Sequence, residues 1–183
     1  IDEKGLIYHI GTLVEGKPSQ LEGREVRVNA CVDAEYRKQV SINHTSTHLL
    51  HYALREVFGK EIRQAGSSVS NERLRFDFVC FSQLNPEDVR KAESIVQEKI
   101  FEDNPVIVEE MSLDEAVERG AIALFMEKYG EKVRIIKTGG YHTEVCGGTH
   151  MARTGEAVLF RITGFSSIGQ NLKRIEAVTY KEA

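Results

Sequence analysis

Two short segments of the chain each carry a pair of metal-binding side chains four residues apart. The first is His44-Thr45-Ser46-Thr47-His48, and the second, far away in the sequence, is Cys146-Gly147-Gly148-Thr149-His150. One thiolate and three imidazoles suit Zn²⁺ and suit Ca²⁺ or Mg²⁺ poorly. The pattern therefore predicts a zinc site formed by His44, His48, Cys146 and His150, which only a folded chain can assemble.

A different set of ligands remains open at this stage. His44, His48 and His51 follow one another at i, i+4 and i+7, so on a helix they share one face. Such a trio would bind a metal ion without Cys146. Replacing Cys146 would therefore distinguish the two arrangements, because only the first would lose its metal.

The hydrophobic pattern predicts the elements that must position these residues. Apolar residues at helical spacing predict a helix over 37–58, on which His44 and His48 point to one side. The glycines of the second segment predict a turn that lets Cys146 and His150 converge. Further helices are expected at 86–101 and after the capping-box sequence that starts at Ser112. Strands are expected at 6–10, 24–32, 62–69, 74–79, 106–111, 133–137, 141–145, 156–163 and 172–179.

This order of elements lacks a strict β-α-β alternation. It indicates an α+β fold, mainly antiparallel sheet with packed helices around the zinc site. We expect residues 1–35 to be the remnant of a small, truncated N-terminal β unit and residues 36–183 to form the zinc-containing domain. The chain begins with Ile1 rather than Met, so we also expect it to be a piece of something longer.

Composition excludes several classes of protein. The chain has 183 residues, of which 41% are hydrophobic, enough for a sizeable core and too many for a disordered chain. Its formal net charge of −4 argues against a non-specific nucleic-acid binder, which would be basic. Three cysteines do not make a disulfide framework, and we expect Cys31 and Cys80 to be core thiols in a reducing cytoplasm. No apolar run is long enough to predict a membrane span, and no signal peptide is recognisable.

Several longer motifs follow one another along the chain. They are H-T-S-T-H-L-L-H at 44–51, Q-A-G-S at 64–67, R-L-R-F-D-F at 73–78, A-L-F-M-E-K-Y-G at 123–130, C-G-G-T-H at 146–150 and R-I-E-A-V-T at 174–179. With this combination the chain resembles, from about Leu6 to its end, the editing domain of alanyl-tRNA synthetase. Free-standing alanyl-tRNA editing proteins and the editing domain of threonyl-tRNA synthetase are similar relatives. The C-G-G-T-H form and the E-K-Y-G segment favour the alanyl branch.

The resemblance implies an enzyme that uses zinc to hydrolyse mischarged seryl- or glycyl-tRNA(Ala), as the editing part of a cytoplasmic alanine-tRNA ligase. Its partners would be the acceptor end of tRNA(Ala) carrying serine or glycine and the remainder of the synthetase chain, with no membrane. Such a second site is needed because an apolar pocket rejects an added hydroxyl only about a hundredfold. The alternatives are a structural zinc module that binds tRNA without catalysis and a free-standing trans-editing protein.

The resemblance also assigns roles around the metal, whose four ligand positions are matched by the predicted zinc ligands. Gln64 matches a glutamine of the editing pocket, and we expect it to orient the attacking water or the substrate ester. Thr45 is expected to recognise the serine hydroxyl or to act as an N-cap. Gly147, Gly148 and Thr149 are expected to present backbone N–H groups to the substrate. Whether zinc would activate water or hold the substrate stays open.

Contacts to RNA are expected from Lys173 and Arg174, with other basic residues behind them, namely Arg63, Arg73 and Arg75. Asp77 and Glu144 are expected to support the site or the fold rather than to react. His142 stands where many members of the family carry a small hydroxyl residue, a departure that leaves the predicted zinc ligands intact.

Overall fold

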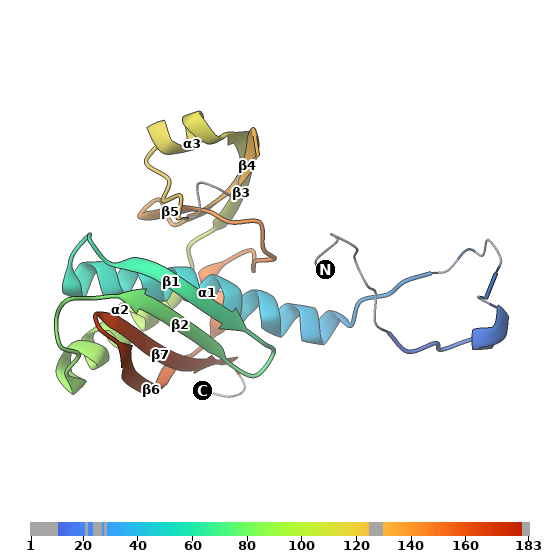
Figure 1. The fold of residues 1–183 in the computed structure, drawn as a ribbon, viewed down its shortest axis with the longest axis horizontal. Coiled ribbons are helices and arrows are strands. Elements are labelled where there is room, and N and C mark those ends of the chain that lie inside the picture. Colours follow the sequence, from blue (N-terminus) through green and yellow to red (C-terminus); the bar gives the residue numbers. More distant parts are fainter. Residues whose placement is uncertain (1–10, 21, 24–26, 28, 125–129, 181–183) are drawn as a thin grey trace. The chain divides into compact units, whose positions relative to one another are not determined.

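The protein is described by a computed structural model, which covers residues 11–20, 22–23, 27, 29–124 and 130–180 (Figure 1). The chain divides into two compact units, Ile1–Val32 and Asp33–Ala183. In the first unit, the described residues form the short 3₁₀ helix η1 (Pro18–Gln20). Residues 29–33 have no regular structure, so the strand predicted over 24–32 is wrong there, and the predicted strand at 6–10 lies outside the described residues. The interpretation of residues 1–35 as a remnant β unit stays a prediction.

The long helix α1 (Ala34–Phe58) carries the first metal-binding segment. It begins after Asp33, whose Oδ1 accepts a hydrogen bond from the Tyr36 N–H, as a good N-cap does. It ends before Gly59, whose φ of 106° favours glycine. Because the cap is Asp33, the helix starts before residue 37, and Thr45 lies in its buried interior rather than at an N-cap.

A four-stranded antiparallel sheet forms the larger layer of the second unit. Its strands are β1 (Arg63–Val69), β2 (Leu74–Val79), β6 (Phe160–Gly169) and β7 (Leu172–Thr179), in the order β1-β2-β7-β6. Helix α1 packs against β1, β2 and β7, and helix α2 (Pro86–Phe101) packs against α1 and β6. Figure 1 shows both helices along one side of this sheet. Phe76 and Phe78 of β2 are fully buried on the helix side, where they anchor the main core.

A second, three-stranded antiparallel sheet carries the other half of the metal-binding pattern. It contains β3 (Val106–Ser112), β4 (Lys132–Thr138) and β5 (His142–Val145), in that order. The short helix α3 (Leu113–Glu118) follows β3, and the Ser112 Oγ accepts the Glu115 N–H as the capping-box pattern predicts. The two sheets and their helices confirm the predicted α+β fold with antiparallel strands.

The predicted strand at 156–163 is wrong in its first half. Residues Thr154–Ala157 form a 3₁₀ helix, η3, and β6 begins only at Phe160. The Glu156 Oε1 accepts the backbone N–H groups of Ala152 and Arg153, which closes a tight turn. Val158 then adopts a φ of 61°, a left-handed conformation that no strand contains.

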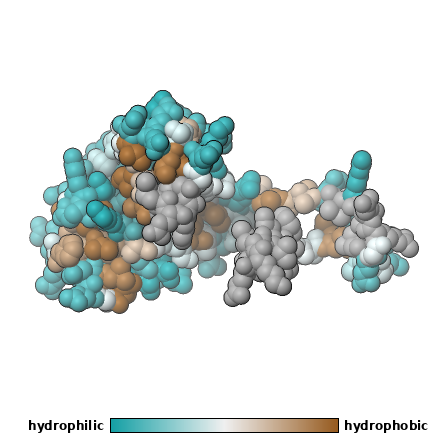
Figure 2. All heavy atoms as spheres, turned by 45° about the horizontal axis from the view of Figure 1, so that its top comes forward, coloured by the Kyte–Doolittle hydropathy of each residue, from teal (hydrophilic) through white to brown (hydrophobic). Residues whose placement is uncertain are grey.

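The remaining sequence expectations concern the surface and the thiols. Among the described residues, no helix is both long and apolar enough to cross a membrane. The face shown in Figure 2 carries hydrophobic side chains between hydrophilic ones, which is usual for folded proteins.

Cys80 is buried, as predicted for a core thiol. Cys31 is exposed, so its assignment to the core is wrong, and the reason is that no strand forms over the described residues around it.

Candidate metal centre

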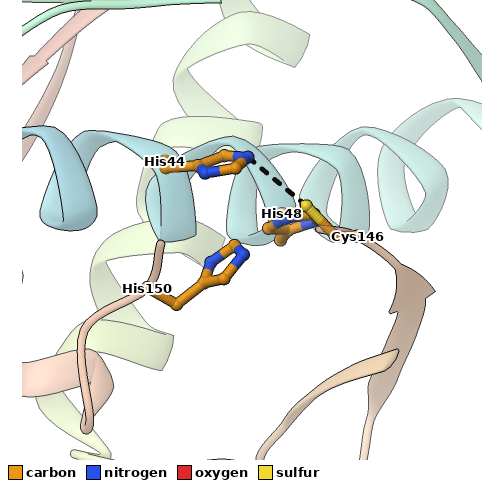
Figure 3. Close-up of side chains that lie close together, drawn as sticks. All are labelled: His44, His48, Cys146 and His150. Atoms are coloured by element: carbon orange, nitrogen blue, oxygen red, sulfur yellow. Dashed lines mark hydrogen bonds between the residues drawn. The ribbon is translucent and has the colours of Figure 1, made fainter. Parts of the chain in front are cut away.

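The four predicted zinc ligands converge in the folded chain. His44 and His48 project from neighbouring turns of α1, and Cys146 and His150 come from the segment that follows β5 (Figure 3). One potential ligand atom from each of the four lies within 4.8 Å of those of the others. Cys146 Sγ lies 3.5 Å from His44 Nε2. The structure therefore brings together the mixed thiolate and imidazole set that the sequence predicts.

The alternative trio of His44, His48 and His51 is not the set that forms. His51 is fully buried, and its Nδ1 makes a hydrogen bond with Glu144 Oε1. Among the described residues, no group able to hold a metal ion includes His51. The third imidazole of α1 is therefore bonded to the carboxylate and does not join His44 and His48 in a metal-binding group.

The segment that carries Cys146 is held in place by β4. The Cys146 N–H donates to the Arg134 carbonyl, and the Arg134 guanidinium donates to the Gly147 carbonyl at 3.0 Å. Gly148 lies against the His44 ring, and a Cβ at this position would overlap the ring atoms Cε1 and Nδ1. A Cβ on Gly147 would meet nothing within 4 Å. The close approach to His44 thus explains one glycine of the C-G-G-T-H segment, and neither glycine has a positive φ.

Hydrogen bonds on the outer side fix which nitrogen of two imidazoles faces the centre. The His48 Nδ1 is bonded to the Glu144 carboxylate, and the His150 Nδ1 lies 3.2 Å from Thr45 Oγ1. The Nε2 atoms of both rings are buried and have no partner. Unpartnered buried nitrogens are costly unless a ligand satisfies them, and zinc binds such neutral imidazole nitrogens. The donor set and the orphaned atoms therefore fit a zinc ion.

The surroundings of Cys146 favour its thiolate form, which binds a metal cation. Burial alone would raise the pKa of Cys146, but the surrounding imidazoles of His150, His44 and His48 outweigh it and lower this pKa to about 3. Burial likewise opposes protonation of His48, but the Glu144 carboxylate and Cys146 outweigh it and raise the His48 pKa to about 10, so zinc binding would displace the proton from Nε2 and leave the one on Nδ1. Burial lowers the pKa of His150, which keeps that ring neutral. A thiolate at neutral pH is the form that binds zinc.

Thr45 and the residues of the Cys146 segment occupy different environments. Thr45 is fully buried, and its hydroxyl donates to the Ser41 carbonyl while it accepts the Met151 N–H. A hydrogen bond from Thr45 to a substrate hydroxyl would have to replace one of these bonds, and its role in recognition stays a prediction. Gly147 and Thr149 are exposed, so their backbone groups are accessible to a ligand.

Gln64 lies on the helix side of the four-stranded sheet. It pairs with Phe78 across β1 and β2, and paired residues of antiparallel strands point to the same face. Phe78 is buried under the helices, so Gln64 does not face the open side of the sheet. Its side chain is half-buried, and its Nε2 donates to Ser67 Oγ at 3.0 Å. A catalytic role for Gln64 stays a prediction.

The two predicted RNA contacts, Lys173 and Arg174, point to opposite faces of the sheet because they are neighbours on β7. Arg174 donates to both oxygens of Asp77, at 2.7 and 2.9 Å. Lys173 donates only to Ser167 Oγ, at 2.8 Å, among the bonds of the described residues. Arg174 is already engaged by a carboxylate, and a role of the two residues in RNA contact stays a prediction.

A buried cluster beside the ligands is the feature that sequence reasoning underestimated. Glu144 contacts His48, His51 and His142, and all four side chains are buried. His142 and Glu144 alternate along β5, so they point to one face of the strand. This alternation immediately before Cys146 is the signal from which the cluster could have been predicted.

Comparisons with known proteins agree with this geometry. The family described as "Threonyl and Alanyl tRNA synthetase second additional domain" matches residues 133–176, which include Cys146 and His150. Alanine--tRNA ligase of Thermoanaerobacter sp. (strain X514) is 46% identical over 93% of this chain, and that of Listeria innocua is 51% identical over 85%. The alignments cover 19% and 18% of those proteins, so the chain spans about a fifth of their length. By sequence, this chain is thus similar to the editing-type domain of alanyl-tRNA synthetases.

Proposed function

We propose that this chain hydrolyses the ester bond of mischarged seryl- or glycyl-tRNA(Ala) with the help of a zinc ion, as the editing part of an alanyl-tRNA synthetase. The observation that carries the proposal is the convergence of His44, His48, Cys146 and His150 with two unpartnered Nε2 atoms, in a chain similar to alanine--tRNA ligases. The partners would be the acceptor end of tRNA(Ala) and the rest of the synthetase chain, in the cytoplasm.

The chemistry of this proposal is that of a water attacking an aminoacyl ester. A bound zinc ion would polarise an oxygen or fix a substrate group at the site. Cys146 and the three histidines would hold that ion, and the exposed Gly147 and Thr149 leave this side of the centre accessible. Gln64 would orient the water or the ester, since its amide can donate to one and accept from the other.

Contact with RNA would be limited to the tRNA end. Lys173, whose ammonium is bonded only to a serine hydroxyl among the described groups, is better placed to meet a phosphate than the paired Arg174. A small basic contact would suit an acidic domain acting as one part of a longer tRNA-binding protein.

A structural zinc module is the second candidate function. Four protein ligands normally close a structural zinc site, whereas catalytic sites keep a position open. This module would unfold without zinc and would hydrolyse nothing. A free-standing trans-editing protein is a further candidate, although the two relatives compared above are about five times as long as this chain.

The test compares two substrates on the same folded protein. We expect release of serine from seryl-tRNA(Ala) and little release of alanine from alanyl-tRNA(Ala). A Gln64→Ala variant should lower the rate of serine release while its zinc content stays at the wild-type level. Equal rates on both substrates would contradict the proposed selectivity, and no hydrolysis by the zinc-loaded protein would favour the structural module.

A further inference from the structure

One buried carboxylate lies against three imidazoles beside the proposed ligands. The side chain of Glu144 is 3% exposed, and its two oxygens accept hydrogen bonds from His48 Nδ1 and His51 Nδ1. His142 Nε2 lies 3.2 Å from Glu144 Oε1, although its orientation makes no hydrogen bond. Burying an ionised carboxylate is costly unless it is paired, so this position needs a reason.

The hydrogen bond to His48 has a direct consequence for metal binding. An imidazole that donates through Nδ1 keeps its lone pair on Nε2, and the Nε2 of His48 is buried without a partner on the side of the other ligands. If Nδ1 had no acceptor, the neutral ring could also place its proton on Nε2, and that tautomer cannot bind a metal ion. Glu144 therefore selects the competent form of His48.

The charges of the centre point to a second consequence. A zinc ion with one thiolate and three neutral imidazoles carries one net positive charge. The carboxylate of Glu144 lies directly behind one of those imidazoles and carries the opposite charge. An uncompensated buried charge destabilises a protein, and an adjacent opposite charge offsets that effect.

We propose that Glu144 is a positioning residue of the metal centre, which holds His48 in its Nδ1–H tautomer and balances the residual charge of the bound ion. His51 in turn holds the carboxylate against His48 through its own hydrogen bond to Glu144. The inference rests on the proposed zinc site and concerns its supporting residues rather than the ligands themselves.

A second metal ion is the competing interpretation of the same cluster. His48, His142 and Glu144 also lie close enough to hold an ion. His48 would then have to bind two ions, one through each nitrogen, and would have to lose its Nδ1 proton. The hydrogen bond between His48 and Glu144 favours the positioning role, because that proton is what joins the two side chains.

The test measures zinc affinity by competition with a chelator. Glu144→Gln removes the charge and keeps the shape, and outer residues of this kind change metal affinity by roughly 10–100-fold. We expect this loss for Glu144→Gln while its circular dichroism spectrum stays unchanged. Glu110→Gln is the matched control, since Glu110 is an exposed carboxylate of the same sheet, and it should bind zinc within twofold of wild type.

The outcomes separate the inference from the proposed function. If wild type binds no zinc, the metal centre itself is wrong. If wild type binds zinc and Glu144→Gln binds it equally well, only the role of Glu144 is overturned. If wild type binds two zinc ions per chain and Glu144→Gln binds one, the carboxylate is itself a metal ligand, and the inference is also overturned.

A measurement on wild type covers the case in which Glu144→Gln does not fold. Nuclear magnetic resonance of ¹⁵N-labelled histidines in the zinc-loaded protein reports which nitrogen of each ring carries a proton. We expect a proton on His48 Nδ1 and the metal on Nε2. The reverse arrangement would contradict the inference, and a merely structural role for Glu144 would not fix this tautomer.

Discussion

Asp77 and Glu144 are two strand carboxylates held by neighbouring cationic or imidazole side chains, and their surroundings give them different tasks. Asp77 on β2 accepts two hydrogen bonds from Arg174 on the outer face of the four-stranded sheet, with the side chains 12% and 31% exposed. Glu144 on β5 is buried, and one of the imidazoles that it contacts, that of His48, directs its other nitrogen to the proposed metal.

The difference teaches that the partner decides the role of a buried or half-buried acid. The Arg174 guanidinium cannot extend the interaction to a metal ion, because it carries only donors and has no lone pair to offer. An imidazole can extend the interaction, because a hydrogen bond that keeps the proton on one nitrogen leaves the lone pair of the other nitrogen available to a metal ion. We therefore expect changes at the Glu144 side to affect metal binding and changes at Asp77 to affect stability alone.

The largest expected effect comes from removing a ligand. Cys146→Ala should lower the affinity for zinc by more than the roughly 10–100-fold expected for a residue behind the ligands, because it removes the thiolate ligand itself. Serine release should fall with it. Zinc content measured on the purified protein checks the prediction, and retention of zinc by Cys146→Ala would revive the site made of His44, His48 and His51.

The two neighbouring glycines offer a sharper comparison within the centre. Gly148→Ala places a Cβ against the His44 ring and should displace it, at a cost of about 1–3 kcal/mol for overpacking. Gly147→Ala meets open space and should bind zinc like wild type. Zinc affinities of the two variants test this, and equal affinities would show that His44 is not held against Gly148.

Thr45 connects the centre to the core. Thr45→Val removes the acceptor of the Met151 N–H and the partner of His150 Nδ1, and leaving such buried groups unpaired costs about 1–3 kcal/mol. We expect a lower midpoint of urea unfolding and weaker zinc binding, while Thr45→Ser should preserve both. Unchanged zinc affinity in Thr45→Val would contradict a role in orienting His150.

The smallest effect on the centre is expected from Asp77→Asn. Arg174 lowers the pKa of Asp77 by hydrogen bonding, so the ion pair contributes stability that is fully present above the ordinary pKa of 3.8 and is lost as pH falls through the lowered pKa. Asp77→Asn should lose about 1 kcal/mol of stability at neutral pH and show a weaker loss of stability towards acid. Denaturant unfolding measured at several pH values checks this, and a change in zinc affinity would contradict the separation of the two regions.

Sequence reasoning could predict the ligands because their types and spacing are local properties. The i, i+4 pair on α1 and the pair in the C-G-G-T-H segment required only helix geometry and zinc chemistry. The strand β2 and the helix α2 were predicted with their observed bounds, since Phe76 and Phe78 alternate with polar residues and Pro86 marks a first helical turn.

The rest depended on contacts that the sequence does not display. The role of Gly148 follows from a His44 ring more than a hundred positions away, and the orientation of His48 follows from Glu144. Residues Thr154–Ala157 form η3 and Val158 follows it with a φ of 61°, so the strand predicted there begins only at Phe160. The opposite directions of Lys173 and Arg174 follow from the strand period, which needed the strand assignment first.

The most direct test of the metal centre is a zinc titration of the stripped protein with activity followed in the same samples. We predict that one equivalent of zinc binds, and that hydrolysis of seryl-tRNA(Ala) rises in proportion to the zinc bound. Full binding without hydrolysis, or hydrolysis that does not depend on zinc, would contradict the proposal that these four residues hold the metal of an editing site.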